Sequence, residues 1–511
     1  MPIRLQDWIQ AKKASQTHRQ LIVISGPEAW TIESIITLSE EWDFSNFLSV
    51  GIKVESPDML PGISVTNSHY RQCLGQEFDG VIYNAYRGFR ANAVMALSGT
   101  IKREGLMFLL CPDLDNWAYF NDPEREKRTS FGFERSFLSS AFVKHLVTNI
   151  KQTDDVVLLT PEQFKGKLAL SPVRPGSNLD LDRTPSQERA IQKIIKVATG
   201  HRKRPLVIDA DRGRGKSSVL GMAAAELLKG SCKNIIITAP NASACQQVFV
   251  HAKNNWPESG GDNMVLKIKD KQLRFIPPDA LLSTQPNADL LLIDEAAAIP
   301  TPLLKQLLSL SSRIVFSTTV DGYEGSGRGF EIRFKKHLDA HTPDWHSLHL
   351  SEPVRWDKGD PLERFWFNTL LMKEASSRAH ELAVTSQHAL NFTVFQGKEI
   401  TAQPGLLSSL FSLMINAHYQ TVPDDLQRML DSPDHSVLVA RQRKELIGAI
   451  LFVDEPAYLG DLTDDIHRGK RRVNGHLLSQ SLCFHCGFRE ATALTYIRTV
   501  RIAVNPSLQQ Q

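Results

Sequence analysis

The feature that most constrains this chain is a glycine-bearing loop between a run of strand formers and a run of helix formers. Residues 206–218 read Leu-Val-Ile-Asp-Ala-Asp-Arg-Gly-Arg-Gly-Lys-Ser-Ser, and a helical pattern follows over residues 219–229. In such a unit the backbone N–H groups of the loop and the positive end of the helix face phosphate oxygens. Lys216 would reach the β- and γ-phosphates of a nucleoside triphosphate, and the Ser217 hydroxyl would ligate Mg²⁺. Ala210 replaces the first glycine of the usual G-x-x-x-x-G-K-[ST] pattern, and we expect the loop to close with this small residue.

A second motif places two acids directly after an apolar strand pattern. Residues 290–295 read Leu-Leu-Leu-Ile-Asp-Glu. Asp294 is placed to hold the Mg²⁺ shell, and Glu295 to polarise the attacking water. Taken alone, the Gly-Lys-Ser triplet also fits an ordinary helix start, and the acids also fit a solvated strand end. Together, at a domain-sized spacing, the two motifs predict a core that binds and hydrolyses a nucleoside triphosphate.

Two weaker features fit the same core. Residues 322–330 read Gly-Tyr-Glu-Gly-Ser-Gly-Arg-Gly-Phe, a loop whose backbone must approach something closely. Arg328 in this loop could neutralise charge that develops on a phosphate, although an incidental arginine in a glycine-rich turn fits equally well. Gln187 precedes the first strand of the core, where helicase-like ATPases place a glutamine that binds adenine.

Length and composition limit the class of protein. The chain has 511 residues, enough for roughly three compact domains. Its 42% hydrophobic and 23% charged residues are typical of globular chains, which excludes a collagenous, coiled-coil or wholly disordered protein. No apolar run approaches the roughly 18 residues of a membrane span, and the N-terminus carries charges where a signal peptide would be apolar. We therefore expect a cytoplasmic protein with no membrane partner.

Turn-rich segments at 171–178 and 351–361 divide the chain into three predicted α/β or α+β domains. Their expected boundaries are 1–170, 183–352 and 362–511. In the first domain, the order of strand and helix patterns predicts a parallel sheet. Its expected elements are strands at Leu21–Ser25, Gly80–Asn84 and Leu106–Cys111 and a helix over 91–103. In the second domain, a helix is expected to open at Thr184–Pro185, followed by strands at 205–210, 234–239, 289–293 and 313–318. The third domain is expected to finish on a strand over 499–504.

The charge balance predicts at most a local surface for a polyanion, because the formal net charge is only +3. Short basic clusters occur at 201–204, 333–336 and 468–472, and basic residues alternate with aromatic ones at 355–356 and 364–367. With an ATPase core they make RNA a reasonable partner. The simpler interpretation, which we favour for each segment, is a solvated basic face and aromatic side chains in the core. Cys483 and Cys486 lack further ligands at zinc-site spacing, so we expect two small buried side chains.

The end of the chain resembles part of a GCN5-related acetyltransferase. Residues 500–506 read Val-Arg-Ile-Ala-Val-Asn-Pro, like the strand that precedes the acyl-CoA loop in that fold. There the next residues, of pattern Q/R-x-x-G-x-G/A, wrap the pyrophosphate of coenzyme A at a helix start. The printed sequence reaches Gln511 before any such glycine.

These motifs together resemble the bacterial tRNA(Met) cytidine acetyltransferase (TmcA) family over essentially the whole chain. The residues that carry the resemblance lie at 212–217, 294–300, 317–319, 322–330, 417–420, 480–482 and 501–504. The resemblance implies a multidomain α/β fold: an N-terminal Rossmann-like domain, a RecA-like P-loop helicase domain and a partial acetyltransferase domain. It also implies formation of N4-acetylcytidine at the wobble position of elongator methionine tRNA, from acetyl-CoA with ATP hydrolysis.

The resemblance also assigns site residues. Those implied to contact ATP are Gln187, Gly213, Arg214, Gly215, Lys216, Ser217, Ser218 and Arg328, and Asp294 with Ser217 would hold Mg²⁺ beside the catalytic Glu295. Ile502, Ala503 and Val504 would lie along acetyl-CoA, through hydrogen bonds of the strand to its pantetheine. Because the phosphate-binding pattern for coenzyme A does not follow that strand, we expect weak or absent acetyl transfer by the chain as printed. The alternative is an ATP-dependent RNA-binding or remodelling module without acetyl transfer.

Overall fold

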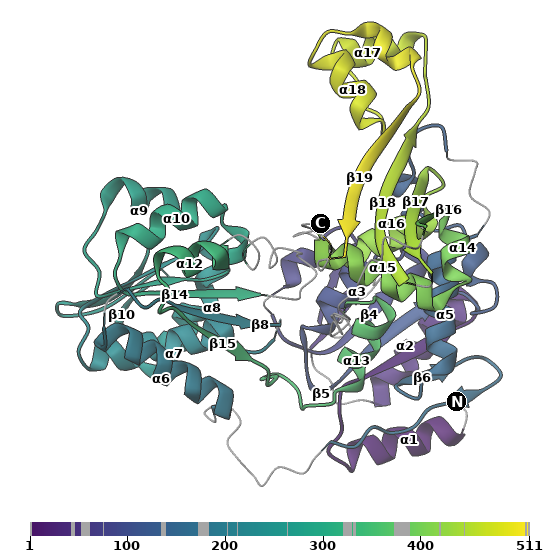
Figure 1. The fold of residues 1–511 in the computed structure, drawn as a ribbon. Coiled ribbons are helices and arrows are strands. Elements are labelled where there is room, and N and C mark those ends of the chain that lie inside the picture. Colours follow the sequence, from purple (N-terminus) through teal and green to yellow (C-terminus); the bar gives the residue numbers. More distant parts are fainter. Residues whose placement is uncertain are drawn as a thin grey trace. The chain divides into compact units, whose positions relative to one another are not determined.

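A computed structural model describes most of the chain (Figure 1). The described residues are 3–41, 46–52, 62–74, 76–133, 139–171, 183–201, 203–211, 213–262, 264–319, 330, 334–372, 389–417, 421–443, 445–505 and 508. The chain divides into two compact units. Unit 1 combines residues 1–171 with residues 359–511, and unit 2 comprises residues 172–358. The three-domain division expected from the sequence stays a prediction, and its first linker lies largely outside the described residues.

The N-terminal part of unit 1 is built on a seven-stranded sheet in the order β3-β2-β4-β5-β1-β6-β7. Its strands are β1 (Gln20–Ser25), β2 (Phe47–Val50), β3 (Gly62–Val65), β4 (Phe78–Asn84), β5 (Ile101–Cys111), β6 (Val156–Leu159) and β7 (Phe164–Lys165). Only the β6–β7 pair is antiparallel, so the predicted parallel sheet is confirmed. Helices α1 (Ile3–Lys13) and α2 (Glu28–Glu41) pack on one face through a shared apolar core. The helix expected over 91–103 is wrong at its end, because α3 (Ala91–Ser98) stops before Gly99 and β5 already begins at Ile101.

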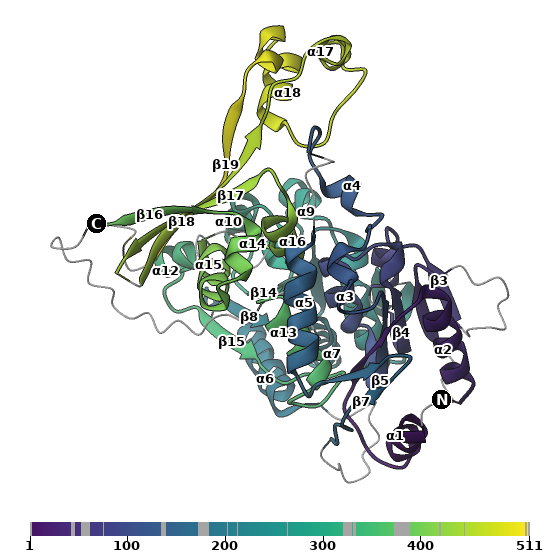
Figure 2. The ribbon, with the colours of Figure 1, turned by 90° about the vertical axis from the view of Figure 1, so that its right-hand side faces the viewer.

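The C-terminal part of unit 1 is a mixed α+β segment. Strands β16 (Asn391–Phe395), β17 (His435–Gln442), β18 (Glu445–Glu455) and β19 (Tyr496–Val504) form an antiparallel sheet in that order. Helix α15 (Pro404–Ala417) contacts β18 and β19. Between β18 and β19 the chain forms α17 (Asp461–His467) and α18 (Leu477–Phe484), which stand beyond the end of the two strands (Figure 2).

Buried polar contacts join the two parts of unit 1. Arg19 Nε and Nη2 donate to the two carboxylate oxygens of Asp360 at 3.1 and 3.0 Å, and neither side chain is more than 1% exposed. Asp360 is also the N-cap of α13 (Pro361–Thr369), which contacts β1, β6, α3 and α5 (Ala141–Gln152). Removing one partner of such a buried pair leaves an uncompensated charge, so loss of Arg19 or Asp360 alone should strongly destabilise unit 1.

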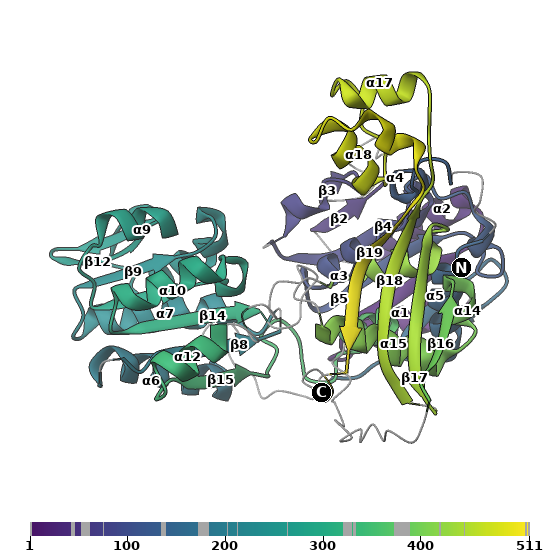
Figure 3. The ribbon, with the colours of Figure 1, turned by 45° about the horizontal axis from the view of Figure 1, so that its top comes forward.

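Unit 2 holds an eight-stranded sheet in the order β10-β11-β12-β9-β13-β14-β8-β15 (Figure 3). The strands are β8 (Leu206–Ala210), β9 (Asn234–Thr238), β10 (Gly260–Asp262), β11 (Val265–Ile268), β12 (Lys271–Phe275), β13 (Leu290–Ile293), β14 (Ile314–Thr319) and β15 (His346–Leu350). From β12 to β15 all neighbours are parallel. The predicted core strands are therefore confirmed within one or two residues.

Helices cover both faces of the unit 2 sheet because its side chains alternate. Ile208, Ile235 and Leu292 share one core with α6 (Pro185–Thr199), α7 (Lys216–Lys229) and α8 (Gln246–Asn255). Their neighbours Val207, Ile236 and Ile293 share another with α9 (Pro278–Thr284), α10 (Thr301–Leu310) and α12 (Lys335–His341). This two-sided burial is why the strands are almost continuously apolar in sequence.

Three smaller expectations can now be compared with the structure. Trp356 and Trp366 are at most 3% exposed, which confirms the interpretation of these aromatic residues as core. Cys483 is buried but Cys486 is exposed, so the expectation of two buried thiols is wrong for the second. Cys486 follows the end of α18, where the chain turns away from the helix core. Among the described helices, none combines the length and the apolar character needed to cross a membrane.

Candidate functional site

The glycine-bearing loop connects β8 to the start of α7. Gly213 and Gly215 have φ angles of +79° and +77°, and Gly215 is the N-cap of α7. This left-handed conformation strains any residue with a Cβ. A Cβ on Gly215 would also lie 2.6 Å from Gln187 Nε2 and 2.8 Å from Val354 Cγ2. Both the backbone and the space therefore require glycine, and the loop brings its N–H groups to the N-terminus of α7.

A segment after β15 supports this loop, and sequence reasoning missed its role. Val354 N donates to Gly213 O at 3.1 Å, and a Cβ on Gly213 would meet Trp356 Cη2 at 2.5 Å. The Arg214 guanidinium lies 5.8 Å from the centre of the Trp356 ring. No strand was expected over β15, and its position explains the contact: β15 pairs with β8 up to Leu350 and Ala210, so the residues after both strands meet at one edge.

Ser217 and Asp294, the two residues expected to hold Mg²⁺, are in direct contact. The Ser217 hydroxyl donates to Asp294 Oδ2 at 2.8 Å. Asp294 is fully buried, and burial together with the neighbouring Glu295 charge raises the pKa of its carboxyl well above the ordinary value. The Ser217 hydroxyl and the Lys216 ammonium act in the opposite direction on the same pKa. One carboxylate and one hydroxyl suit Mg²⁺, which keeps several of its waters when it binds protein and phosphate.

Glu295 is held in an uncommon conformation at the end of β13. Its φ is +46°, the left-handed region, and its N–H donates to Asp294 Oδ1 at 3.0 Å. Thr319, the last residue of β14, donates its hydroxyl hydrogen to the Glu295 carboxylate at 3.0 Å. Backbone strain of this kind costs on the order of 1–3 kcal/mol and persists where surrounding contacts hold it, often at functional sites. The carboxylate is thereby oriented toward the strand ends that carry Asp294 and Thr319.

The remaining nucleotide-site residues fall in different places. Gln187 lies against the loop but also caps its own helix, since Thr184 N donates to Gln187 Oε1 at 3.0 Å. Arg214 is 7% exposed and pairs with Asp211, while Ser218 is half-buried in the first turn of α7. Arg328 lies outside the described residues. The structure thus brings Gln187 and the loop of 213–218 together with Asp294, Glu295 and Thr319 at one edge of the sheet.

The strand expected to bind acetyl-CoA is at the edge of the C-terminal sheet. Ile502, Ala503 and Val504 pair with Ile450, Ala449 and Gly448 of β18. Ile502 and Val504 are 56% and 37% exposed, whereas Ala503 is 1% exposed. One face of β19 therefore packs inward, and the other carries apolar side chains on an open surface.

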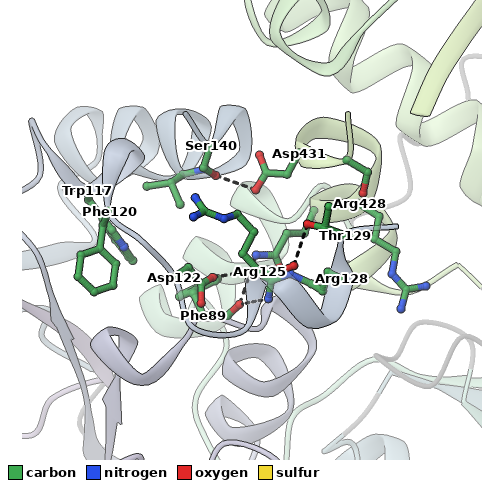
Figure 4. A pocket seen from close by; sticks show the side chains of 13 residues that line it. Phe89, Trp117, Phe120, Asp122, Arg125, Arg128, Thr129, Ser140, Arg428 and Asp431 are labelled. Carbon is green, nitrogen blue, oxygen red and sulfur yellow. Dashed lines mark hydrogen bonds and ion pairs between the residues drawn. The ribbon is translucent and has the colours of Figure 1, made fainter. Parts of the chain in front are cut away.

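A separate cavity in unit 1 lies between the N-terminal part and α16 (Pro423–Asp431) (Figure 4). Arg128 pairs with Asp122, and Asp431 accepts hydrogen bonds from Ser140 Oγ and Phe142 N at 2.7 and 2.9 Å. The cavity volume is about 30 Å³, enough for only a few water molecules. The hydrogen bonds of Asp431 cross from α16 to the N-terminal part, so the cavity is part of the packing between the two parts of unit 1.

Comparisons with known proteins cover all three regions. Family models match residues 3–161 (tRNA(Met) cytidine acetyltransferase TmcA, N-terminal), 207–373 (RNA cytidine acetyltransferase NAT10/TcmA, helicase domain) and 409–511 (GNAT acetyltransferase 2). Among solved structures, the large terminase of a thermophilic bacteriophage is 15% identical, with a TM-score of 0.28 over 38% of this chain and 51% of that one.

Curated relatives match nearly the whole chain. A tRNA(Met) cytidine acetyltransferase TmcA of Nitrosococcus halophilus is 37% identical over 98% of this chain and 68% of the relative. The proteins of the same name from Vibrio cholerae and Yersinia pestis are 37% and 32% identical, over 88% and 98% of this chain and 60% and 68% of their own. The chain thus spans about two thirds of the length of these relatives. The fold is multidomain α/β with a P-loop helicase domain and a GNAT domain, and the chain belongs to the tRNA(Met) cytidine acetyltransferase TmcA family.

Proposed function

We propose that this protein forms N4-acetylcytidine at the wobble position of elongator methionine tRNA, using acetyl-CoA and the hydrolysis of ATP in the cytoplasm. Membership of the family, through relatives named tRNA(Met) cytidine acetyltransferase, is the observation that carries the proposal. The residue assignments rest on the geometry of the two units.

The nucleotide part of the proposal rests on the loop and the acidic pair of unit 2. Backbone N–H groups of 213–217 and the Lys216 ammonium bind the triphosphate, because they lie at the N-terminus of α7. Ser217 and Asp294 hold Mg²⁺, which neutralises charge on the phosphates when it is bound. Glu295 is the catalytic base that orients the attacking water, and Thr319 keeps its carboxylate in place. Gln187 and Ser218 complete the binding set, with Arg328 assigned by resemblance alone.

The acetyl-transfer part rests on β19. An exocyclic cytosine amine is a poor nucleophile, because its lone pair is delocalised into the ring. Most of the rate gain must therefore come from holding the amine against the thioester and removing its proton late. The open face and edge of β19, with Ile502 and Val504 exposed and Ala503 buried, offer a straight template for the pantetheine arm of acetyl-CoA.

Mass spectrometry of nucleosides from elongator methionine tRNA tests this proposal. The tRNA is incubated with the 511-residue chain, ATP and acetyl-CoA, and the wobble cytidine is analysed for the acetyl group. N4-acetylcytidine above a control without protein supports the proposal. ATP hydrolysis stimulated by tRNA with no acetyl transfer at any protein concentration would instead favour the ATP-dependent RNA-binding module.

An exposed and a buried position of the same strand separate the role of β19 in binding from its role in folding. Ile502→Asp places a charge on the open face, where we expect weaker acetyl-CoA binding with little change in thermal stability. Ala503→Asp buries the charge and should lower the stability by about 2 kcal/mol or more. Isothermal titration with acetyl-CoA and thermal unfolding measure the two effects. Equal acetyl-CoA affinity in wild type and Ile502→Asp would remove β19 from the proposed site.

A further inference from the structure

Residues 456–495 form a helical extension between β18 and β19, composed of α17, α18 and a 3₁₀ turn at Arg489–Ala493. It stands beyond the end of the sheet in all three views (Figures 1, 2 and 3). Its base is tied to the N-terminal part of unit 1. Asn474 Nδ2 donates to Lys127 O and Thr129 O at 3.0 and 2.7 Å, and His476 Nε2 lies 2.9 Å from Phe131 O. The extension is therefore a fixed part of unit 1.

The loop between α17 and α18 presents a dense group of cations. Arg468, Lys470, Arg471 and Arg472 are all exposed, and none of them forms an ion pair with another described residue. Their backbone is nevertheless fixed. Lys470 N and Arg471 N donate to Asp465 O, and the Gln480 side chain bonds to Val473 N and O at 3.1 and 3.0 Å. Fixing the backbone while leaving the charges unpaired reduces the entropy that a ligand must remove on binding.

One aromatic side chain lies against the cationic loop, and a second is exposed four residues farther along the chain. The Arg472 guanidinium is 5.8 Å from the centre of the Phe484 ring, and a Cβ on Gly469 would meet Phe484 Cε2 at 2.7 Å. Phe484 is still 40% exposed, and Phe488, just after α18, is 61% exposed. Cations and exposed aromatic rings on one extension are the two kinds of group that hold the phosphates and bases of a single-stranded nucleic acid.

We propose that this surface, made of Arg468, Lys470, Arg471, Arg472, Phe484 and Phe488, binds unpaired nucleotides of the RNA substrate. The cations contact phosphates, and the rings stack on bases, which is how proteins hold single-stranded and looped RNA. The inference rests on the proposed function, because that function supplies a tRNA loop as the ligand. It favours RNA over an acidic protein, since exposed rings add stacking that carboxylates cannot use.

The extension carries acidic as well as basic residues, so only some of its cations are available to bind RNA. Arg489 is already paired with Asp464, so it is left out of the surface. Asp461 and Asp465 lie in α17, on the N-terminal side of the cationic loop. With a formal net charge of only +3 for the whole chain, an RNA surface must come from a local concentration of cations such as this loop.

RNA binding to the full chain, measured by fluorescence anisotropy with elongator methionine tRNA and no acetyl-CoA or ATP, tests the inference. Lys470→Ala/Arg471→Ala should weaken binding several-fold and lower the slope of log affinity against log salt by roughly 0.7 for each charge removed. Lys151→Ala/Lys167→Ala is the matched control, because it removes two exposed lysines of unit 1 that are already paired with Asp115 and Asp154. It should leave the salt slope unchanged.

A second variant tests stacking without changing charge. Phe488→Leu keeps an apolar side chain but removes the ring, and we expect about 10-fold weaker binding. Tyr119→Leu is its control, since Tyr119 is an equally exposed ring (65%) in another part of unit 1. Thermal unfolding of all variants shows that each has folded.

The outcomes separate this inference from the proposed function. Weakened RNA binding by both variants, with no N4-acetylcytidine formed by the wild-type chain, supports the RNA surface and contradicts the proposed reaction. Wild-type affinity and salt slope in both variants overturn the RNA surface, whatever the acetylation assay shows, and leave the surface to a protein partner. Absence of any tRNA binding by the wild-type chain overturns it as well.

Discussion

Asp294 of unit 2 and Asp431 of unit 1 are two aspartates with the same change in pKa but different structural surroundings. Burial raises the pKa of both carboxyls, that of Asp431 to about 6. Asp294 accepts a hydrogen bond from Ser217 and lies near the Lys216 charge and a second acid, Glu295. Asp431 accepts from Ser140 and from the N–H of Phe142, the first turn of α5.

The difference lies in what surrounds each carboxyl. The Asp431 carboxylate accepts hydrogen bonds from a hydroxyl and an N–H group at the positive N-terminal end of α5. Its lone pairs therefore serve to hold α5 in place. Asp294 stands beside the glycine-bearing loop at the start of α7 and next to Glu295, a non-glycine residue with a strained positive φ. A raised pKa alone therefore does not mark a functional site, whereas a raised pKa next to stored strain and a buried lysine does.

The largest expected effect in this comparison is that of Lys216→Ala. Loss of the ammonium removes charge stabilisation at the phosphates, and we expect ATP hydrolysis to fall at least about 100-fold. Lys216 forms no hydrogen bond or ion pair that ties α7 to the rest of the described chain, so thermal unfolding should change little. Hydrolysis is measured as phosphate release with tRNA present. Undiminished ATP hydrolysis by Lys216→Ala would show that the loop of unit 2 is not the nucleotide site.

Asparagine substitution of the two aspartates tests the comparison directly. Asp294→Asn should lower ATP hydrolysis about 100-fold without loss of stability, because it removes a buried charge and a metal ligand together. Asp431→Asn should leave ATP hydrolysis at the wild-type rate and change the free energy of unfolding by about 1 kcal/mol. If instead Asp431→Asn lowered hydrolysis as much as Asp294→Asn, the assignment of one to chemistry and the other to packing would be wrong.

The pH dependence of stability gives a sharper test of Asp431. Its pKa is about 6 in the folded chain and about 3.9 when unfolded, so the folded state binds more protons between those values. Stability from this group is therefore highest below pH 4, falls as pH rises to 6, and is constant above. The full change is at most about 3 kcal/mol, and less because the carboxyl is only partly buried. The difference between wild type and Asp431→Asn, from chemical unfolding at pH 4 and pH 7, isolates it. An identical pH dependence in both proteins would contradict the raised pKa.

Much of the nucleotide site could be predicted because its parts are local in sequence. Residues 206–218 form a strand, a loop and the start of a helix in one stretch. A short apolar run such as Leu290–Ile293 is typical of a strand in a sheet that helices cover on both faces. The spacing also placed Ser217 and Asp294 as partners, and the structure brings them within hydrogen-bonding distance. The roles of these residues in hydrolysis stay predictions.

Contacts between residues distant in the sequence could not be predicted from local patterns. Trp356 supports Gly213 only because β15 lies next to β8, and nothing in the local pattern says which strands are neighbours. The helix expected over 91–103 failed because Gly99 and Thr100 end α3 and a strand begins at once. Basic residues next to aromatic ones at 364–367 drew attention to RNA, yet Trp366 is fully buried. An exposed ring instead lies against the basic cluster at 468–472, where the fold of the extension places Phe484 of α18 against Arg472.

The smallest expected effects concern the two serines that donate to the two aspartates. Ser140 is the N-cap of α5, since its Oγ accepts from Val143 N at 2.9 Å while its hydroxyl hydrogen bonds to Asp431. Ser140→Ala should therefore destabilise unit 1 by about 1 kcal/mol and leave ATP hydrolysis unchanged. Ser217→Ala removes the corresponding hydroxyl from Asp294 and should reduce hydrolysis about 10-fold at low Mg²⁺, with recovery as Mg²⁺ is raised. Recovery at high Mg²⁺ would assign the Ser217 hydroxyl to the metal, because a hydroxyl that only positions Asp294 by packing would give a loss insensitive to Mg²⁺.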